Sequence, residues 1–400
     1  MKKIIASAGL VALSAAGTQA AATMGTTADK PWDVALTVRG FYDDNYNFAP
    51  AGPTKRDSFG IETKPTVGIT LNGQQTSFGA RYTYDMRYYD DRKQNTADHS
   101  HEFNTWLVHA FSERYSVDLA DTFMIAQEPL QQDPGLGVLR SNGSSIHNDG
   151  SINFHAQLTR LLELVLGYRN GLYNYNDTTY ANLLNRMEHL IKADLRWQFQ
   201  PDTTGFVGYQ FGLIDYTGGN TYRNNRSHYL YLGVDHSFLR NLTGSLKVGG
   251  QYVDYYNTRA GDGVLNKHET DVSPYVDASI RYTYRTGSYV EFGFQHHRNA
   301  TDGTSLDQES SSIFGSITHA FTPKLIGNLN AQYQNAAYNQ GIGAYNNQSD
   351  DIFLVGVSME YHFTQHLSAE VGYNYDKIDS KIAGRGYDRN RVYLGMTASY

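Results

Sequence analysis

The residues best suited to chemistry in this sequence are histidines and carboxylates that lie close together. His99, His101 and Glu102 form one group, and His296 and His297 form another. Imidazole and carboxylate groups bind metals such as zinc, but neither group has the i, i+4 spacing of a helical metal site. Both groups also fall next to segments that we expect to be loops. We therefore interpret them as solvated or interfacial histidines and predict no metal site.

Pairs of acidic residues in polar segments offer a second kind of chemistry, because neighbouring carboxylates can bind Ca²⁺ or bridge lipopolysaccharide through divalent cations. The pairs are Asp43-Asp44, Asp90-Asp91 and Asp350-Asp351. None belongs to the twelve-residue loop of calcium-binding proteins. The sequence also lacks Gly-x-Ser-x-Gly, His-Glu-x-x-His and a phosphate-binding glycine loop. We therefore predict no catalytic residues, no cofactor and no enzymatic activity.

Charged residues that alternate with apolar ones form the largest set of candidate site residues. We expect them to line a water-filled lumen. The candidate pore-lining residues are Arg39, Arg81, Asp85, Arg87, Glu163, Arg169, Glu188, Lys192, Asp194, Arg196, Lys247, Asp277, Arg281 and Glu291. Acidic and basic residues are nearly balanced on this face, which predicts weak ion selectivity with a slight cation preference at most. The charges either create a transverse field that orients solutes or form cross-strand ion pairs that stiffen the wall.

The elements that position these charges are predicted β-strands, in which successive side chains point to opposite faces. Val34, Leu36 and Val38 share one face, for example, and Asp33 and Arg39 share the other. A charge on the lipid-facing side of a transmembrane strand costs roughly 2–4 kcal/mol at mid-membrane, and the assigned outer faces are nearly free of charge.

Two acidic residues fall in the outer phase. Asp254 lies near a loop end, where the cost is small. Asp121 lies inside its run, so we expect a β-bulge to move it off the outer face. Pro65 and Pro274 are predicted towards the loop ends of their strands, because proline cannot donate to a β-ladder.

The strands recur in a repeat of roughly 41 residues. Four similar segments mark strand ends: His109-Ala-Phe111-Ser112, His236-Ser-Phe238-Leu239, His319-Ala-Phe321-Thr322 and Tyr361-His-Phe363-Thr364. A short polar turn follows each of them, whereas the other connection in each repeat is long and rich in Asn, Asp, Gly and Tyr. This asymmetry and the aromatic bands at both strand ends are typical of outer-membrane barrels. We count eighteen strands, with sixteen or twenty left open.

The longest predicted loop, 127–147, contains two prolines and several glycines. One hypothesis is that it folds inward and narrows the pore. An ordinary exposed loop is the alternative, and the sequence leaves both open.

Composition agrees with a β-barrel and excludes other classes. The 400 residues include 38 Gly, 9 Pro, 32 Tyr and no Cys, which excludes disulfides, thiolate zinc sites and a lipid-anchored cysteine. A mean hydropathy of −0.52 is too polar for a helical membrane protein. The net charge of −7 and the mixed signs argue against a nucleic-acid partner.

The first residues are typical of a secretory signal: Lys2 and Lys3 precede a short apolar stretch, and small residues follow up to Ala22. We therefore expect residues 1–22 to be a cleaved signal peptide. Residues 23–400 are then a single domain, an all-β, antiparallel, up-and-down transmembrane barrel. With eighteen strands, both termini lie on the short-turn side, which is the periplasm.

The signal peptide, the His-x-Phe-Ser/Thr segments, the Tyr-rich alternating strands and the terminal Tyr400 resemble the putative outer-membrane β-barrel porin family of bacteria. The resemblance covers roughly residues 30–400. It implies a barrel that conducts small solutes in the bacterial outer membrane, and it supplies no defined functional residues. Tyr400, with the alternating residues before it, resembles the signal that the barrel-assembly machinery recognises.

The predicted function is a porin-like channel for passive diffusion of small hydrophilic solutes. The expected partners are outer-membrane lipid, lipopolysaccharide, the barrel-assembly machinery and the solutes themselves; a homo-oligomer stays open. The alternatives are a substrate-selective channel and a non-conducting structural, surface-binding or enzymatic barrel.

Overall fold

The computed structural model describes residues 30–126, 145–219, 221–257, 269–301, 305–340, 343–345 and 347–400. The predicted signal peptide, residues 1–22, lies outside this part of the chain. So does most of the loop predicted at 127–147, together with the hypothesis that it narrows the pore.

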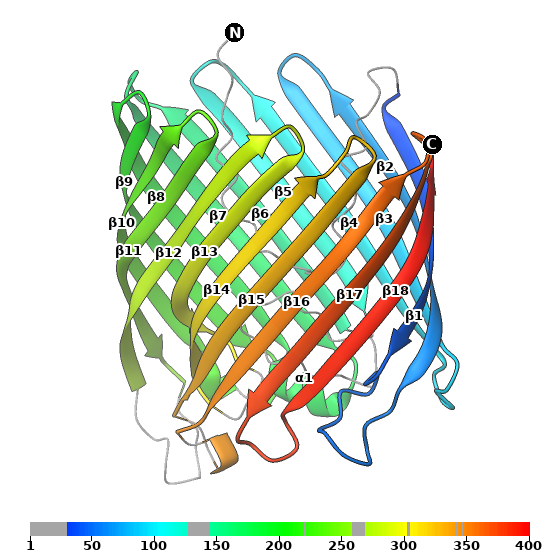
Figure 1. Ribbon diagram of the computed structural model, residues 1–400. Coiled ribbons are helices and arrows are strands. Elements are labelled where there is room, and N and C mark those ends of the chain that lie inside the picture. The colour runs from blue at the N-terminus through cyan, green and yellow to red at the C-terminus, as the bar shows by residue number, and fades with distance from the viewer. Residues whose placement is uncertain are drawn as a thin grey trace.

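The described chain forms eighteen antiparallel strands that close into a barrel (Figure 1). Strands adjacent in sequence pair with each other, and β1 pairs with β18 to complete the ring. The predicted all-β, up-and-down barrel and the predicted strand count are therefore confirmed. The strands are β1 (Trp32–Asp43), β2 (Ser58–Asn72), β3 (Thr76–Tyr89), β4 (Ala97–Ala110), β5 (Tyr115–Ala126), β6 (Ser145–Gln157), β7 (Leu162–Tyr175), β8 (Arg186–Gln200), β9 (Thr203–Tyr216), β10 (Asn225–Leu239), β11 (Leu242–Tyr255), β12 (Glu269–Arg285), β13 (Ser288–Asn299), β14 (Asp307–Ala320), β15 (Leu325–Asn339), β16 (Ser349–His362), β17 (Leu367–Ser380) and β18 (Tyr387–Ser399).

The two rims of the barrel differ in their connections, as predicted (Figure 1). Turns of two to four residues join strands at one rim, where the chain end marked C also lies; we call it the turn rim. The opposite loop rim carries the longer connections, including α1 (Thr178–Leu184) and the 3₁₀ helices η1 (Thr221–Arg223) and η2 (Gly343–Tyr345). Among the described residues, no helix has both the length and the apolar character needed to cross a membrane.

Side chains alternate between the two faces of the wall along each strand. In β1, Val34, Leu36 and Val38 are exposed on the outer surface, whereas Arg39 is only 7% exposed. In β10, Leu230 and Leu232 are 64% and 68% exposed on the same outer surface. Since successive strand residues point to opposite sides, the apolar face lies outside and the charged face lies inside.

The repeated His-x-Phe segments share one geometry at the turn rim. In three of them the two rings meet edge to face, with centroids 4.5–4.6 Å apart: His109 and Phe111, His236 and Phe238, and His319 and Phe321. Residues i and i+2 share a strand face, so both rings lie on the outer surface. Aromatic side chains with polar ring atoms prefer the membrane interface, which accounts for their place at the strand ends.

Asp121 stays on the outer face, and the bulge expected from the sequence is wrong. β5 pairs with β4 and β6 in continuous register here, with Asp121 opposite Thr105 and Gly150. The carboxylate occupies the space that Gly150 leaves, because a Cβ there would lie 3.0 Å from Asp121 Oδ2. Asn148 Nδ2 donates a hydrogen bond to the same oxygen at 3.0 Å. The glycine and the amide thus accommodate the carboxylate without a change of register.

The two prolines interrupt ladders at different depths. Pro274 lies in the loop-side half of β12, as predicted, and the ladder to β13 begins two residues later with Val276 opposite His296. Pro65 lies in the middle of β2, so its predicted place near the loop end is wrong. The pairing of β2 with β3 skips Lys64 and Pro65. Proline has no N–H to donate, which accounts for breaks at these points.

Candidate functional site in the barrel interior

The inner face of the barrel carries most of the strand charges and is the candidate functional site. Barrels of sixteen to eighteen strands are too wide for wall side chains alone to fill. The inner charges and the loops that fold over them therefore decide what fits inside. The inner residues form four groups.

The first group lies on the wall that runs from β17 through β18, β1 and β2 to β3. Arg39 Nη1 is 3.0 Å from Glu62 Oε2, and Arg39 Nη2 is 2.7 Å from Glu370 Oε2. Arg87 Nε lies 2.8 Å from Glu62 Oε1 and its Nη2 lies 3.2 Å from Asp85 Oδ2. Arg39 on β1 thus contacts carboxylates on β2 and β17, and Arg87 contacts one on β2 and one on its own strand, β3. The network holds the side chains against the wall.

The loop at residues 44–57, between β1 and β2, folds over the inner face near the loop rim. Phe48 packs against a buried cluster that includes Leu354 and Tyr387, with an edge-to-face contact of 5.3 Å to Tyr387. The guanidinium of Arg389 lies 4.4 Å from the centroid of the Phe48 ring. Leu354 is buried although Phe353 and Val355 beside it point outward, so the cluster lies on the inner face. This loop therefore narrows the opening at the loop rim.

Polar contacts fix the same loop to β18. Lys55 Nζ lies 2.8 Å from Asp388 Oδ2 and 3.1 Å from Asp44 Oδ2. Partial burial alone would lower the pKa of Lys55, but hydrogen bonds to Asp388 and Asp44 raise it above its ordinary value. The Asn45 side chain is buried and donates to the carbonyl oxygens of Ala49 and Asp388. The loop is thus held at several points.

The second group forms a belt nearer the turn rim. His155 Nε2 lies 2.7 Å from Asp118 Oδ1, and its Nδ1 lies 3.0 Å from Glu163 Oε1. Arg196 forms an ion pair with Asp235 and lies 3.5 Å from Glu163 Oε2. The belt spans β5 to β10, so it connects about a third of the wall.

Lys192 belongs to the same wall but has no direct partner. Among the described residues it makes no hydrogen bond or ion pair. Gly167 on the neighbouring strand makes room for it, because a Cβ there would lie 2.6 Å from Lys192 Cε. Its ammonium is therefore the inner cation best placed to contact an anionic solute.

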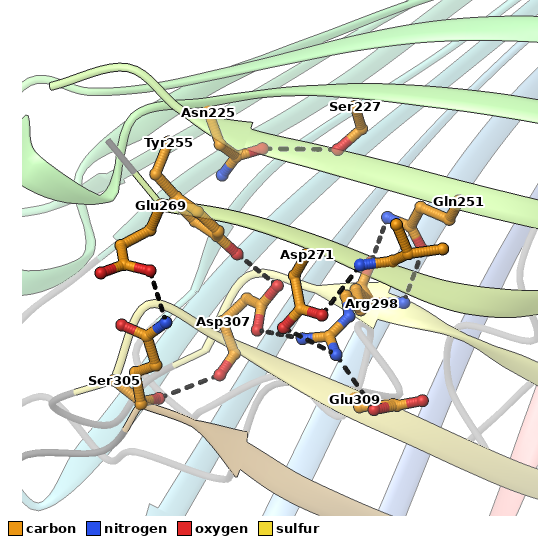
Figure 2. Close-up of polar contacts among 12 residues, drawn as sticks. Asn225, Ser227, Gln251, Tyr255, Glu269, Asp271, Arg298, Ser305, Asp307 and Glu309 are labelled. Carbon is orange, nitrogen blue, oxygen red and sulfur yellow. Dashed lines mark hydrogen bonds and ion pairs between the residues drawn. The ribbon is translucent and has the colours of Figure 1, made fainter. Parts of the chain in front are cut away.

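The third group surrounds Arg298 of β13 and includes Asp271 of β12, Asp307 and Glu309 of β14, and Gln251 of β11 (Figure 2). Arg298 contacts Asp271 at 3.0 Å, Asp307 at 3.1 Å and Glu309 at 3.2 Å. The Arg298 backbone N–H donates to Gln251 Oε1 at 2.8 Å, and its carbonyl accepts from Gln251 Nε2 at 3.3 Å. Gln251 thus supplies the hydrogen bonds that the ladder lacks beyond Pro274, which has no N–H.

The fourth group is a patch of tyrosines on β10 and β12. The Tyr275 ring lies 5.4 Å from Tyr229 and 5.5 Å from Tyr231. Gln251 Nε2 donates to the Tyr229 hydroxyl at 2.8 Å, and Gln210 Nε2 donates to the Tyr231 hydroxyl at 3.0 Å. Aromatic faces next to amide groups are suited to contact sugars or aromatic solutes.

The structure places all the candidate pore-lining residues in the inner phase of their strands, and each except Lys192 has a hydrogen-bonded or ionic partner. The pairs are Arg39 with Glu62, Arg81 with Asp33, Arg87 with Asp85, Glu163 with His155, Arg169 with Asp149, Glu188 with Arg186, Asp194 with Tyr231, Arg196 with Asp235, Lys247 with Asp277, and Arg281 with Glu291. Eight of these ten pairs join different strands, whereas Arg87 with Asp85 and Glu188 with Arg186 lie within one strand. Most of the contacts are therefore of the cross-strand kind that the sequence left open as one of two roles.

The sequence reasoning missed several inner residues. Asp43 is predicted in a polar loop segment and Arg391 is not among the predicted pore-lining residues, yet they pair at 2.8 Å across β1 and β18 and are buried. Arg298 near the end of β13 and Asp307 at the start of β14 also pair, at 3.1 Å. Opposite charges a few residues apart in the sequence, close to the same connection, were a signal that could have found this second pair.

The three members of the first histidine group, His99, His101 and Glu102, do not share one face of β4. His99 and His101 lie on the outer face, where Tyr84 and Tyr82 hydroxyls contact their Nδ1 atoms at 2.6 and 2.8 Å. Glu102 points to the opposite side, because adjacent strand residues alternate. Among the described residues, no group of three or more His, Cys, Asp or Glu side chains could hold a metal ion.

A closed antiparallel barrel with an apolar outer face and a charged inner face is a transmembrane β-barrel. Residues 275–400 match the protein family described as "Putative beta-barrel porin 2". The match confirms the family resemblance seen in the sequence. A search among curated proteins finds no match.

Several solved barrels are similar to this chain at low sequence identity. A BenF-like porin from Pseudomonas fluorescens Pf-5 is 11% identical with a TM-score of 0.48, covering 93% of this chain and 99% of that one. OccK2 (OpdF) from Pseudomonas aeruginosa is 13% identical with a TM-score of 0.47, covering 92% and 98%. The FrpB iron transporter from Neisseria meningitidis is 8% identical with a TM-score of 0.45, covering 93% and 81%.

Proposed function

We propose that the protein is a porin-like channel through which small hydrophilic solutes diffuse passively across the bacterial outer membrane. The observation that carries this proposal is the division of the wall: apolar side chains face outward and paired charges face inward on a closed ring of eighteen strands. A charged inner face needs water, and a ring of this size encloses more space than wall side chains fill.

The orientation follows from the rims. The turn rim faces the periplasm and the loop rim faces the exterior, as in other barrels with short turns and long loops. We propose that residues 1–22 direct export and are removed, and that residues 23–400 form the barrel domain. Tyr400 would then serve as the assembly signal, and lipopolysaccharide would surround the outer leaflet side of the wall.

The pairing of the inner charges supports a channel rather than an enzyme. The acidic and basic groups of the candidate pore-lining set neutralise one another over short distances, so they stiffen the wall and leave little net field. Lys192 is the exception in this set. We propose that the lumen discriminates weakly between ions and mainly by size.

The tyrosine patch favours a second candidate, a substrate-selective channel. Tyr229 and Tyr275 present rings on the inner face, and Gln251 and Gln210 hold the neighbouring hydroxyl groups. Such a surface would slow and orient a sugar or aromatic solute rather than pass all solutes alike.

Liposome swelling with the purified, refolded protein and a graded series of sugars tests the two candidates. Permeation that falls smoothly with solute size supports the diffusion channel. Saturable uptake of one solute, lost in Tyr229→Leu and Tyr275→Leu, supports the selective channel. Absence of swelling and of conductance in planar bilayers contradicts both.

A further inference from the structure

Thr105, Asp121, Asn148 and Gly150 form a polar patch in the middle of the outer face of the wall. Asp121 lies six residues from Tyr115, where β5 leaves the turn rim. With the usual strand rise and tilt, six residues correspond to roughly 15 Å along the membrane normal, near the middle of an apolar band about 25 Å tall.

No other carboxylate of the described strands occupies such a position. Of the remaining outer-phase carboxylates, Asp215, Asp254, Asp351, Asp379 and Asp388 lie within three residues of the loop rim, whereas Asp307 and Glu309 pair with Arg298 in the third inner group. At the rim, water and lipid head groups solvate a carboxylate, whereas at the depth of Asp121 hydrocarbon cannot.

The patch also has unused hydrogen-bonding groups. Asn148 Nδ2 donates to Asp121 Oδ2, but Asp121 Oδ1 accepts no hydrogen bond from the described residues. The Thr105 hydroxyl, directly opposite Asp121 in the ladder, likewise makes none among them. The patch thus contains a free acceptor and a free donor side by side.

Large apolar side chains surround this centre. Leu119, Phe123 and Ile152 are 36–40% exposed on the same outer face, and Gly150 leaves the centre flat. A flat polar centre within an apolar rim fits a second protein surface better than lipid tails, since small and polar residues promote close association within membranes.

We propose that this patch binds the same patch of a second copy of the chain. A two-fold axis through the patch brings Thr105 of each copy to Asp121 of the other, because an isologous contact pairs i with j and j with i. Two symmetry-related hydrogen bonds then form, and they satisfy the donor and the acceptor of both copies with no further partner. Because the patch lies near the middle of the membrane, the partner that covers it must be a membrane protein. A second copy of the chain supplies both the donor and the acceptor that the patch needs.

Cysteine cross-linking tests the proposal directly, because the chain contains no cysteine. Leu119→Cys reports on the patch, and Leu329→Cys is its matched control. Both leucines lie four residues from the turn-rim start of their strands, at 39% and 37% exposure, and their strands lie on nearly opposite sides of the ring. In oxidised outer membranes we expect at least about five-fold more dimer from L119C than from L329C.

The hydroxyl of Thr105 provides the second readout. In the L119C background, Thr105→Val removes the donor and should reduce the dimer about three-fold or more, whereas Thr105→Ser keeps the donor and the dimer. The unheated gel mobility of each variant verifies that the barrel is folded, and the mass of the unmodified protein in mild detergent should be that of a dimer.

Three results would overturn the proposal: equal cross-linking at Leu119 and Leu329, a monomeric mass for the unmodified protein, or an L119C product that contains a different protein. Each result concerns association only. It is therefore independent of whether the lumen conducts.

Discussion

Arg39 shows how a charged side chain is kept inside a wall with little freedom to move. Its guanidinium contacts Glu62 and Glu370, and its side chain is 8% exposed. A buried pair adds little to stability relative to apolar packing, but loss of one partner leaves an uncompensated charge. Replacement of Arg39 should therefore lower the free energy of unfolding by far more than the ion pairs contribute to it.

Arg39→Met should therefore lower the free energy of unfolding by about 3–5 kcal/mol, since Glu62 and Glu370 lose a shared cation. Urea unfolding in lipid vesicles, followed by Trp fluorescence, measures this change. Arg81→Met is the matched control, because Arg81 pairs with Asp33 at 40% exposure and should cost only about 0–1 kcal/mol. Equal losses in the two variants would contradict the argument.

Lys192 is the inner residue whose charge should be most visible in conduction. It has no hydrogen-bonded or ionic partner among the described residues, so Lys192→Glu changes the lumen field by two unit charges. We expect the cation-to-anion permeability ratio to rise on the order of two-fold or more, because rings of fixed charge select ions of opposite sign. Reversal potentials in a KCl gradient across a planar bilayer measure the ratio.

Lys377→Glu controls for the same charge change on the other face. Lys377 lies in the outer phase of β17 near the loop rim and pairs with Asp379 at 3.1 Å. Its reversal potential should stay close to that of the unmodified channel. A shift as large as that of Lys192→Glu would mean that surface charge, rather than the lumen, sets selectivity.

At the scale of elements, the loop at residues 44–57 is the described segment that most clearly narrows the loop rim. Phe48 has φ 51°, in the left-handed region that a bulky residue seldom adopts, and its ring packs on Tyr387. The packing thus maintains a backbone conformation that costs roughly 1–2 kcal/mol.

Deletion of residues 46–50 should therefore widen the opening and raise the single-channel conductance about 1.5-fold or more, because the ring no longer covers the inner face. Planar-bilayer recordings measure it. Replacement of the exposed residues 51–53 with a Gly-Ser sequence of equal length is the control and should leave conductance unchanged. No increase in the deletion would show that the narrowest point lies elsewhere.

The junction of β12 and β13 is a second element whose local stability can be tested, because its backbone depends on hydrogen bonds from one side chain. Gln251 replaces ladder hydrogen bonds for the Arg298 backbone, so Gln251→Leu leaves an amide without an acceptor at a cost of about 1–3 kcal/mol. We expect faster hydrogen exchange at the β13 end, measured by mass spectrometry. Gln295→Leu, on the same inner face but without a hydrogen bond among the described residues, should exchange like the unmodified protein.

At the scale of the whole molecule, the pairing of inner charges predicts a nearly neutral lumen. The permeability ratio of K⁺ to Cl⁻ should lie within about three-fold of unity, with a slight cation preference. A reversal potential in a ten-fold KCl gradient measures this ratio. Strong selectivity for either ion would indicate that unpaired groups, and not the paired wall, control passage.

The sequence predicted the architecture well because the alternation of apolar and polar residues in a strand is visible within a few consecutive residues. Period-two alternation identifies both faces, and the His-x-Phe segments mark the turn rim, so strand number and candidate lumen residues followed from short-range order. Asp121 was recognised as an outer-phase residue for the same reason. The local pattern could not reveal that Gly150, on the neighbouring strand, makes room for it.

The contacts between distant elements could not be predicted in this way. The partners of Arg298 depend on the break in the β12–β13 ladder. The contact of Phe48 with Tyr387 joins the first loop to the last strand. Both depend on register and on ring closure, which no single segment encodes.

The pairing of β1 with β18 has a consequence for biogenesis. No incomplete chain can have a continuous wall, because the first strand obtains its second neighbour only when the last one arrives. Until then, the unpaired N–H and C=O groups of the two edge strands can form hydrogen bonds with other unfolded chains. A chain truncated before β18 should therefore lack a closed wall and keep both edges unpaired, so we expect it to aggregate or be degraded rather than to form a smaller barrel.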